Sequence, residues 1–136
     1  MTEIISNLFV GTREDAAALG ASVPPEWVCI AVTEYRHELP NEPAGSIDMQ
    51  YMENWSANIA KLDAVAQRIQ DGLDQDKKVL VHCVLAVERS PLAIVWYLVW
   101  SGRFLSIDTA YRYVIGRHPR AERRDVWLRG LSPMRR

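Results

Sequence analysis

One stretch decides the fold of this 136-residue chain, and it reads Val79-Leu80-Val81-His82-Cys83-Val84-Leu85-Ala86-Val87-Glu88-Arg89-Ser90-Pro91. Its apolar start predicts a buried strand, and the apolar residues that follow, up to Trp100, predict a buried helix. Ser90 suits the N-cap of that helix and Pro91 its first position, where the missing N–H leaves no hydrogen bond unmade. We therefore expect a strand, a loop with Cys-x5-Arg spacing and a central helix.

Outward from this stretch, apolar runs of strand length alternate with apolar stripes of helical period. Because strands alternate with helices, we predict an α/β fold with a central, mostly parallel sheet of about four to five strands flanked by helices. The length suits one domain over residues 1–136. The expected strands are 7–11, 27–32, 47–52 and 78–81, and the expected helices are 12–19, 59–73, 91–100, 107–118 and 126–131.

The charge gives no global sign of a nucleic-acid or membrane partner, because the net charge is −1. Its distribution is uneven: residues 1–111 carry a net charge of −7 and residues 112–136 a net charge of +6, all from arginines against two acidic residues. Isolated surface charges more often pair with their own chain than form a docking patch. We therefore expect the arginines to pair with the acidic remainder.

The cysteine content and the hydropathy indicate a compartment. Two cysteines, Cys29 and Cys83, do not suggest a disulfide framework, which favours a reducing environment. No segment has the pattern of a signal peptide, and the longest apolar run falls short of the roughly 20 residues that cross a bilayer. We expect a cytoplasmic, monomeric protein without a membrane partner.

The loop brings together what cysteine-dependent cleavage of a phosphate ester requires. The thiolate is the nucleophile, and a helix N-terminus with a nearby positive charge stabilises it at Cys83. Backbone N–H groups at the start of a helix bind phosphate without particular side chains. Arg89 can hold two phosphoryl oxygens in a bidentate manner, which a lysine does less well. An acid outside the loop must give a proton to the leaving oxygen.

His82-Cys83-x5-Arg89-Ser90 resembles the signature of the cysteine-dependent protein tyrosine phosphatases, and the chain length is similar to that of the small dual-specificity branch. The resemblance extends over nearly the whole chain, since Ile5 to Gly11 followed by Asp15-Ala16 is similar to the family's opening strand and turn. It implies a dual-specificity-phosphatase-like fold. It also implies hydrolysis of phosphotyrosine esters, with phosphoserine and phosphothreonine as further substrates, on a phosphorylated protein or another phosphate ester.

The same resemblance implies a role for each residue of the loop. Cys83 would form a phosphocysteine intermediate, and Arg89 would hold the phosphate and its transition state. Ser90 would hydrogen-bond the sulfur and help it leave, while His82 would support the loop from behind. The family needs no metal or other cofactor. The backbone of the remaining loop residues would bind the phosphate, and these are Val84, Leu85, Ala86, Val87 and Glu88.

Two residues depart from the family pattern within the loop. Ala86 stands where the family usually has glycine, so a left-handed backbone there would add strain of roughly 1 kcal/mol. Glu88 places a carboxylate just before Arg89, and we expect it to pair at the rim, since it would repel phosphate if it faced it. Both departures bear on the turnover rate more than on phosphate binding.

The general acid is the third departure. The family uses an aspartate some thirty residues before the cysteine, and the matching segment 51–58 contains none. Glu53 falls at the equivalent place and is chemically able to donate a proton, although an exposed loop carboxylate is an equally good interpretation. Asp48, within an expected strand, is the second candidate.

Other interpretations stay open. Ala86 and the missing aspartate would also fit a phosphate-binding module with little or no turnover. A rhodanese-like sulfur carrier also holds a cysteine in a cradle loop, although the histidine and the Arg-Ser pair fit a phosphatase better. Cys29 is expected in the core, with a protective disulfide to Cys83 as the alternative. His37 and His118 are expected at the surface.

Overall fold

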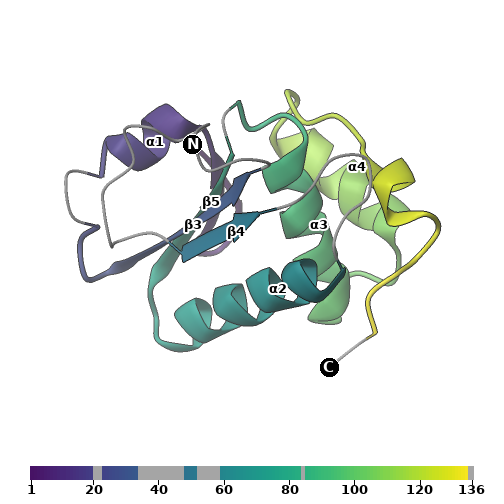
Figure 1. The fold of residues 1–136 in the computed structure, drawn as a ribbon, viewed down its shortest axis with the longest axis horizontal. Coiled ribbons are helices and arrows are strands. Elements are labelled where there is room, and N and C mark those ends of the chain that lie inside the picture. Colours follow the sequence, from purple (N-terminus) through teal and green to yellow (C-terminus); the bar gives the residue numbers. More distant parts are fainter. Residues whose placement is uncertain (20–22, 34–47, 52–58, 84, 135–136) are drawn as a thin grey trace.

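A computed structural model describes residues 1–19, 23–33, 48–51, 59–83 and 85–134. Over these residues it contains a five-stranded sheet in the order β1-β2-β5-β3-β4, with helices on both faces (Figure 1). The strands are β1 (Thr2–Ile5), β2 (Leu8–Gly11), β3 (Trp27–Thr33), β4 (Asp48–Tyr51) and β5 (Lys78–His82). The helices are α1 (Arg13–Ala17), α2 (Ile59–Asp74), α3 (Arg89–Trp100), α4 (Ile107–Arg117) and the 3-10 helix η2 (Asp125–Leu128).

The topology confirms the α/β prediction and positions the cysteine. Strands β2, β5, β3 and β4 run parallel, and only β1 pairs antiparallel, at the edge. β5 is central, and its last residue, His82, is level with Gly11 on one side and Ala31 on the other. Cys83 therefore follows at the carboxyl edge of a parallel sheet, where α/β folds place their ligands.

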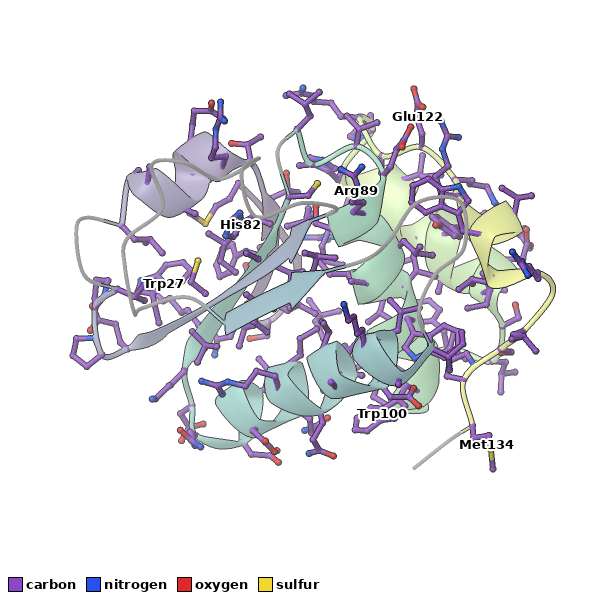
Figure 2. All side chains as sticks on the ribbon, viewed as in Figure 1. Trp27, His82, Arg89, Trp100, Glu122 and Met134 are labelled. Carbon is purple, nitrogen blue, oxygen red and sulfur yellow. The ribbon has the colours of Figure 1, made fainter. Side chains whose placement is uncertain are left out.

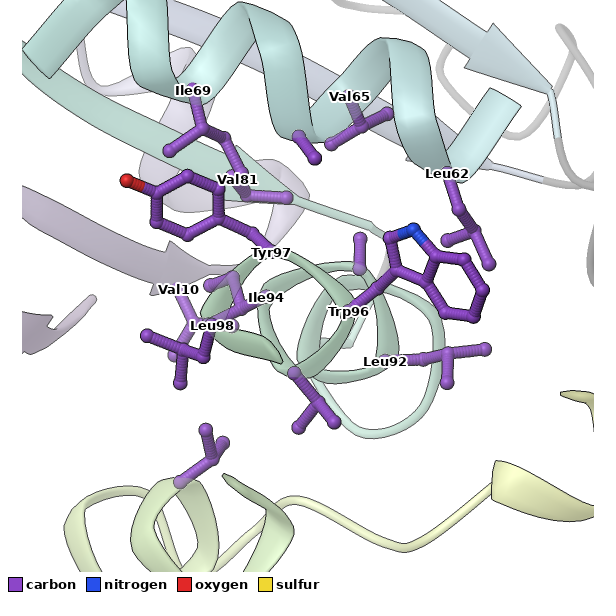
Figure 3. Close-up of a cluster of buried hydrophobic side chains, with 14 of the residues drawn as sticks. Val10, Leu62, Val65, Ile69, Val81, Leu92, Ile94, Trp96, Tyr97 and Leu98 are labelled. Atoms are coloured by element: carbon purple, nitrogen blue, oxygen red, sulfur yellow. The ribbon is translucent and has the colours of Figure 1, made fainter. Parts of the chain in front are cut away.

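The larger core lies between the sheet and helices α2 and α3. Val79 and Val81 of β5 face this core, while Leu80 between them faces α1, as the alternation of a strand requires. All residues of α3 from Ser90 to Trp100 are buried, because α2, the sheet and α4 surround it. Figure 3 shows Trp96 of α3 turned toward Leu62 of α2, and Leu98 on the side of α3 away from α2. This burial fixes the start of α3 beneath the cysteine loop.

Several expected helix boundaries are confirmed. Thr12 caps α1 in a capping box with Asp15, and Ser106 caps α4 by accepting from the Thr109 N–H. Gly102, with φ of 82°, follows the end of α3 in the left-handed conformation. Among the described residues, no helix is both long and apolar enough to cross a membrane.

Two features of the fold differ from the sequence prediction. Strand β1 was not expected as a separate strand; it returns to β2 through Asn7, whose φ of 66° is one that asparagine tolerates. The prediction of Ser90 as the N-cap of α3 was wrong, because the helix starts at Arg89 with Glu88 as its cap residue. Ser90 and Pro91 lie inside the first turn instead, which frees the Ser90 hydroxyl for a contact other than capping.

Candidate active site

A cavity of about 230 Å³ opens at the carboxyl end of β5 and is lined by Cys83, Leu85, Val87, Glu88 and Arg89. Apart from the cysteine at the end of the strand and the arginine that starts α3, these residues come from the loop between them. Figure 2 shows Arg89 at the first turn of α3, above the central strands. One short segment thus places a thiol, a guanidinium and the start of a long helix around the same cavity.

The Ser90 hydroxyl lies beside the thiol. Its oxygen is 3.2 Å from the Sγ of Cys83, within hydrogen-bonding distance for sulfur. Ser90 is fully buried and Cys83 is 4% exposed, so water does not compete for this contact. The contact exists because Ser90 lies one residue into α3 and its side chain points back under the loop.

Ala86 adopts the left-handed conformation that its place in the loop would require, with φ of 59°. Its carbonyl oxygen lies 2.9 Å from the Nε2 of His118. Its methyl group is buried and belongs to the main core, so packing offsets part of the conformational strain. The loop therefore tolerates an alanine where glycine would be the ordinary choice.

Glu88 pairs with an arginine of the C-terminal region, as its position before Arg89 led us to expect. Its Oε1 accepts a charge-assisted hydrogen bond from Nη2 of Arg124, and both side chains are about one-third exposed. The same arginine also lies near Glu122. The pair holds the carboxylate at the rim of the cavity with its charge compensated, which reduces repulsion of an anion.

His82 lies directly before Cys83 with its ring fully buried. Burial lowers the pKa of His82 to about 4, against smaller opposing effects from a hydrogen bond with the Cys83 backbone and from the charge of Asp15. The ring is therefore neutral at pH 7. The ring faces the α1 side of the sheet, opposite α3, and the supporting role that the resemblance implied for it stays a prediction.

His118 is not at the surface, and the prediction that placed it there was wrong. It is 8% exposed, follows the last residue of α4 and bridges two distant segments. Its Nδ1 lies 2.9 Å from the hydroxyl oxygen of Thr2, and its Nε2 contacts the Ala86 carbonyl. A histidine followed by Pro119 gives no periodic signal in the sequence that would indicate such a role.

Some of the C-terminal arginines pair with acidic residues, which confirms that interpretation for Arg112, Arg123 and Arg124. Arg112 and Arg123 both bind Asp108, and Arg123 also binds Asp125. These pairs tie the region of η2 to α4. Together with the Arg124 pair, they fix the C-terminal segment next to the cavity.

The remaining predicted site residues fall into two groups. Glu53, Val84 and His37 lie outside the described residues, so the acid assignment stays a prediction; Asp48 begins β4, within a strand as expected. Cys29 is buried with Ala16 and Leu80 on the α1 face, which confirms its place in a core. Neither Cys29 nor Cys83 is in a disulfide. Within the described residues, no three His, Cys, Asp or Glu side chains group as metal ligands.

Comparison with known families gives a match for most of the chain. Residues 27–135 match the family model described as "Dual specificity phosphatase, catalytic domain". This range includes β3, β5, the cysteine loop, α3 and the C-terminal segment that contacts the loop.

Curated relatives and solved structures agree with that match. The chain is 26% identical over 115 residues to "Dual specificity protein phosphatase OPG106" of Monkeypox virus, covering 84% of this chain and 67% of the relative. The vaccinia virus protein of the same name is 25% identical over the same length.

The structure is similar in fold to human DUSP28, with a TM-score of 0.73 over 93% of this chain and 86% of the other, at 17% identity. It is also similar to the human tyrosine phosphatase-like serine/threonine/tyrosine-interacting protein, with a TM-score of 0.76 at 19% identity over 95% and 91% of the two chains.

Proposed function

The chain belongs to the dual specificity phosphatase catalytic domain family, and on that premise we propose that it hydrolyses phosphate monoesters of proteins through a phosphocysteine intermediate. Phosphotyrosine is the primary substrate, with phosphoserine and phosphothreonine as further ones. The observation that carries the proposal is the shared cavity of Cys83 and Arg89, with the Ser90 hydroxyl 3.2 Å from the sulfur.

In the first step the Cys83 thiolate attacks phosphorus, and the bond between phosphorus and the ester oxygen breaks. The leaving oxygen takes its electron pair and a proton from the acid. Arg89 holds two equatorial oxygens of the transferring phosphoryl group, and the N–H groups of the loop stabilise the charge on the third. The product alcohol or phenol departs, and the phosphoryl group stays on sulfur.

In the second step a water oxygen attacks phosphorus, and the bond between phosphorus and sulfur breaks. Sulfur leaves with its electron pair, and the Ser90 hydroxyl donates a hydrogen bond to the developing thiolate. The water gives up a proton to the conjugate base of the acid that served in the first step. Inorganic phosphate is released, and the thiolate is regenerated.

Glu53 is our candidate for the acid, with Asp48 as the second. Its spacing before the cysteine and its place between β4 and α2 support this assignment. A glutamic acid can supply the proton as well as an aspartic acid can, provided that its carboxyl reaches the leaving oxygen.

The residues at the cavity mouth favour a protein substrate over a strongly anionic one. Leu85 is 58% exposed beside the cavity, and Val87 also lines it, so both can contact the aromatic ring of a phosphotyrosine. The segment 84–88 contains no lysine, whereas a phosphoinositide or nucleic-acid phosphate would favour extra cations there. A phosphorylated protein is therefore the partner that we propose. A reducing, cytoplasmic location fits two cysteines that are not in a disulfide.

Hydrolysis of p-nitrophenyl phosphate and of a phosphotyrosine peptide tests the function. The wild-type chain should release phosphate from both, and Cys83→Ser should release none while keeping its fold. Vanadate binding by the wild type without any turnover would contradict catalysis and favour a phosphate-binding module instead.

A further inference from the structure

One distant segment holds three consecutive residues of the cysteine loop. The Ala86 carbonyl oxygen lies 2.9 Å from Nε2 of His118, and the Val87 carbonyl accepts from the Glu122 N–H at 2.8 Å. The Glu88 carboxylate accepts from Arg124. We call residues 118–124 the brace. Figure 2 shows Glu122 at the same end of the molecule as Arg89.

The His118 ring has a defined orientation and proton position. A carbonyl oxygen can only accept, so Nε2 must carry the proton that it donates to Ala86. In the neutral ring Nδ1 then accepts from the Thr2 hydroxyl, 2.9 Å away. The ring is 8% exposed, so its contact with Ala86 is buried, while its contact with Thr2 is partly buried.

The two brace hydrogen bonds act on the peptide planes of the loop. In a trans peptide the carbonyl and the following N–H point in opposite directions. Because the Ala86 carbonyl points to His118, the N–H of Val87 points away from the brace. Because the Val87 carbonyl points to Glu122, the N–H of Glu88 does the same. Both Val87 and Glu88 line the cavity that contains Cys83.

The Ala86–Val87 peptide is the one whose orientation needs a hydrogen-bond partner. Ala86 has φ of 59°, a conformation that an alanine resists and a glycine adopts freely. Without a partner for its carbonyl, this peptide could turn over and point an oxygen at the bound anion. Held in place, left-handed and right-handed residues in succession form a nest of N–H groups, which binds anions.

We propose that His118 is a positioning residue, which fixes the Ala86–Val87 peptide so that the N–H group of Val87 binds the substrate phosphate, beside that of Glu88, which the hydrogen bond from Glu122 fixes. This inference rests on the proposed phosphatase function and adds a residue that acts on the loop from outside. His118 touches neither the substrate nor the sulfur, so its effect must pass through the loop backbone.

The test compares vanadate affinity among full-length variants at a temperature where each is folded by circular dichroism. His118→Ala should weaken vanadate binding about tenfold, as expected for one lost hydrogen bond of the oriented network. Thr2→Val, which removes only the partner of Nδ1, should weaken it less. If His118→Ala does not fold, the vanadate affinity of Thr2→Val tests the role of His118 in its place. In NMR spectra, the Val87 and Glu88 amide signals should shift on vanadate addition in the wild type and shift less in His118→Ala.

Tyr113→Phe is the matched control. Its hydroxyl also links α4 to β1, by donating to the Ile4 carbonyl at 2.7 Å, but it does not touch the loop. It should lower the melting temperature and leave vanadate affinity unchanged. Adding Ala86→Gly to His118→Ala should restore part of the lost affinity, because glycine needs no support at positive φ.

The outcomes separate this inference from the proposed function. Absence of both vanadate binding and turnover in the wild type would overturn the proposed function. The role of His118 alone is overturned if the wild type binds vanadate and turns over substrate, and folded His118→Ala and Thr2→Val bind vanadate as tightly as the wild type. A loss of vanadate affinity in Tyr113→Phe as large as that in His118→Ala would also overturn the role of His118.

Discussion

The hydroxyl oxygen of Ser90 lies 3.2 Å from the sulfur of Cys83, and both side chains are buried. The contact follows from the helix boundary, because α3 starts at Arg89 and includes Ser90 in its first turn. A hydroxyl so placed can donate a hydrogen bond to the thiolate that forms when sulfur leaves phosphorus. Ser90 is therefore expected to act on the second chemical step more than on the first.

Ser90→Ala should slow hydrolysis of the phosphocysteine by about ten- to a hundredfold, since a hydrogen bond to a charged group is worth about 1.5–3 kcal/mol. Phosphocysteine formation should change little. Stopped-flow release of p-nitrophenol should then show a burst close to one equivalent, followed by a slow steady rate. A slower burst with no change in the steady rate would contradict this assignment.

The Glu88 and Arg124 pair predicts a loss of vanadate binding and activity in one variant and their recovery in a double variant. Arg124→Ala leaves the Glu88 carboxylate uncompensated at the cavity, so vanadate binding and kcat/KM should both fall several-fold. Adding Glu88→Gln should restore them, because the uncompensated charge is gone. Stability should change by about 1 kcal/mol or less, since the pair is partly exposed. Arg112→Ala, which breaks an exposed pair away from the loop, is the control. A double variant as weak as Arg124→Ala would refute charge compensation.

His82 gives a dependence of stability on pH. Burial lowers its pKa in the folded protein to about 4, below the ordinary value near 6.5. The unfolded chain therefore binds the proton more readily, and the stability that the neutral ring provides is complete above pH 6.5. It is lost progressively as the pH falls toward 4, by about 3 kcal/mol in total. Urea unfolding between pH 7 and 4 should show this loss in the wild type and a flatter profile in His82→Asn. Equal slopes would contradict it.

The fold could be predicted because its central strands are buried on both faces. That burial makes 27–32 and 79–81 continuous apolar runs, and the helical stripe of α2 is equally plain. Strand β1 escaped prediction because it is an edge strand with only Ile4 fully buried, and its pairing depends on the left-handed Asn7. The local sequence pattern predicts the central strands of a parallel sheet better than its edge strands.

The site shows the same division between local and distant information. Cys83, Arg89 and Ser90 share one short segment, so their spacing together with the strand before and the helix after indicated a common site. His118 and Arg124 could not be predicted, because their partners at Ala86 and Glu88 lie 32 and 36 residues away and no periodicity links them. Ser90 was misplaced as a cap because Ser-Pro is an ordinary helix start, and only the packing of α3 determines where the helix begins.

The acid assignment has its own test. In Glu53→Gln, kcat for p-nitrophenyl phosphate should fall by about a hundredfold, the common contribution of a general acid, and the alkaline limb of the kcat/KM profile should disappear. A substrate with a more acidic leaving group should be affected less, because it needs less protonation. An unchanged rate with an unchanged alkaline limb would remove Glu53 and direct the same experiment to Asp48→Asn.

The covalent step is the central claim, and rapid quenching tests it most directly. Wild-type and Ser90→Ala proteins are mixed with p-nitrophenyl phosphate, stopped in acid within milliseconds, and digested for mass spectrometry. We predict a phosphate adduct on the peptide that contains Cys83, more abundant in Ser90→Ala and absent in Cys83→Ser. Steady turnover with no adduct on Cys83 in either protein, or undiminished turnover by Cys83→Ser, would contradict the mechanism.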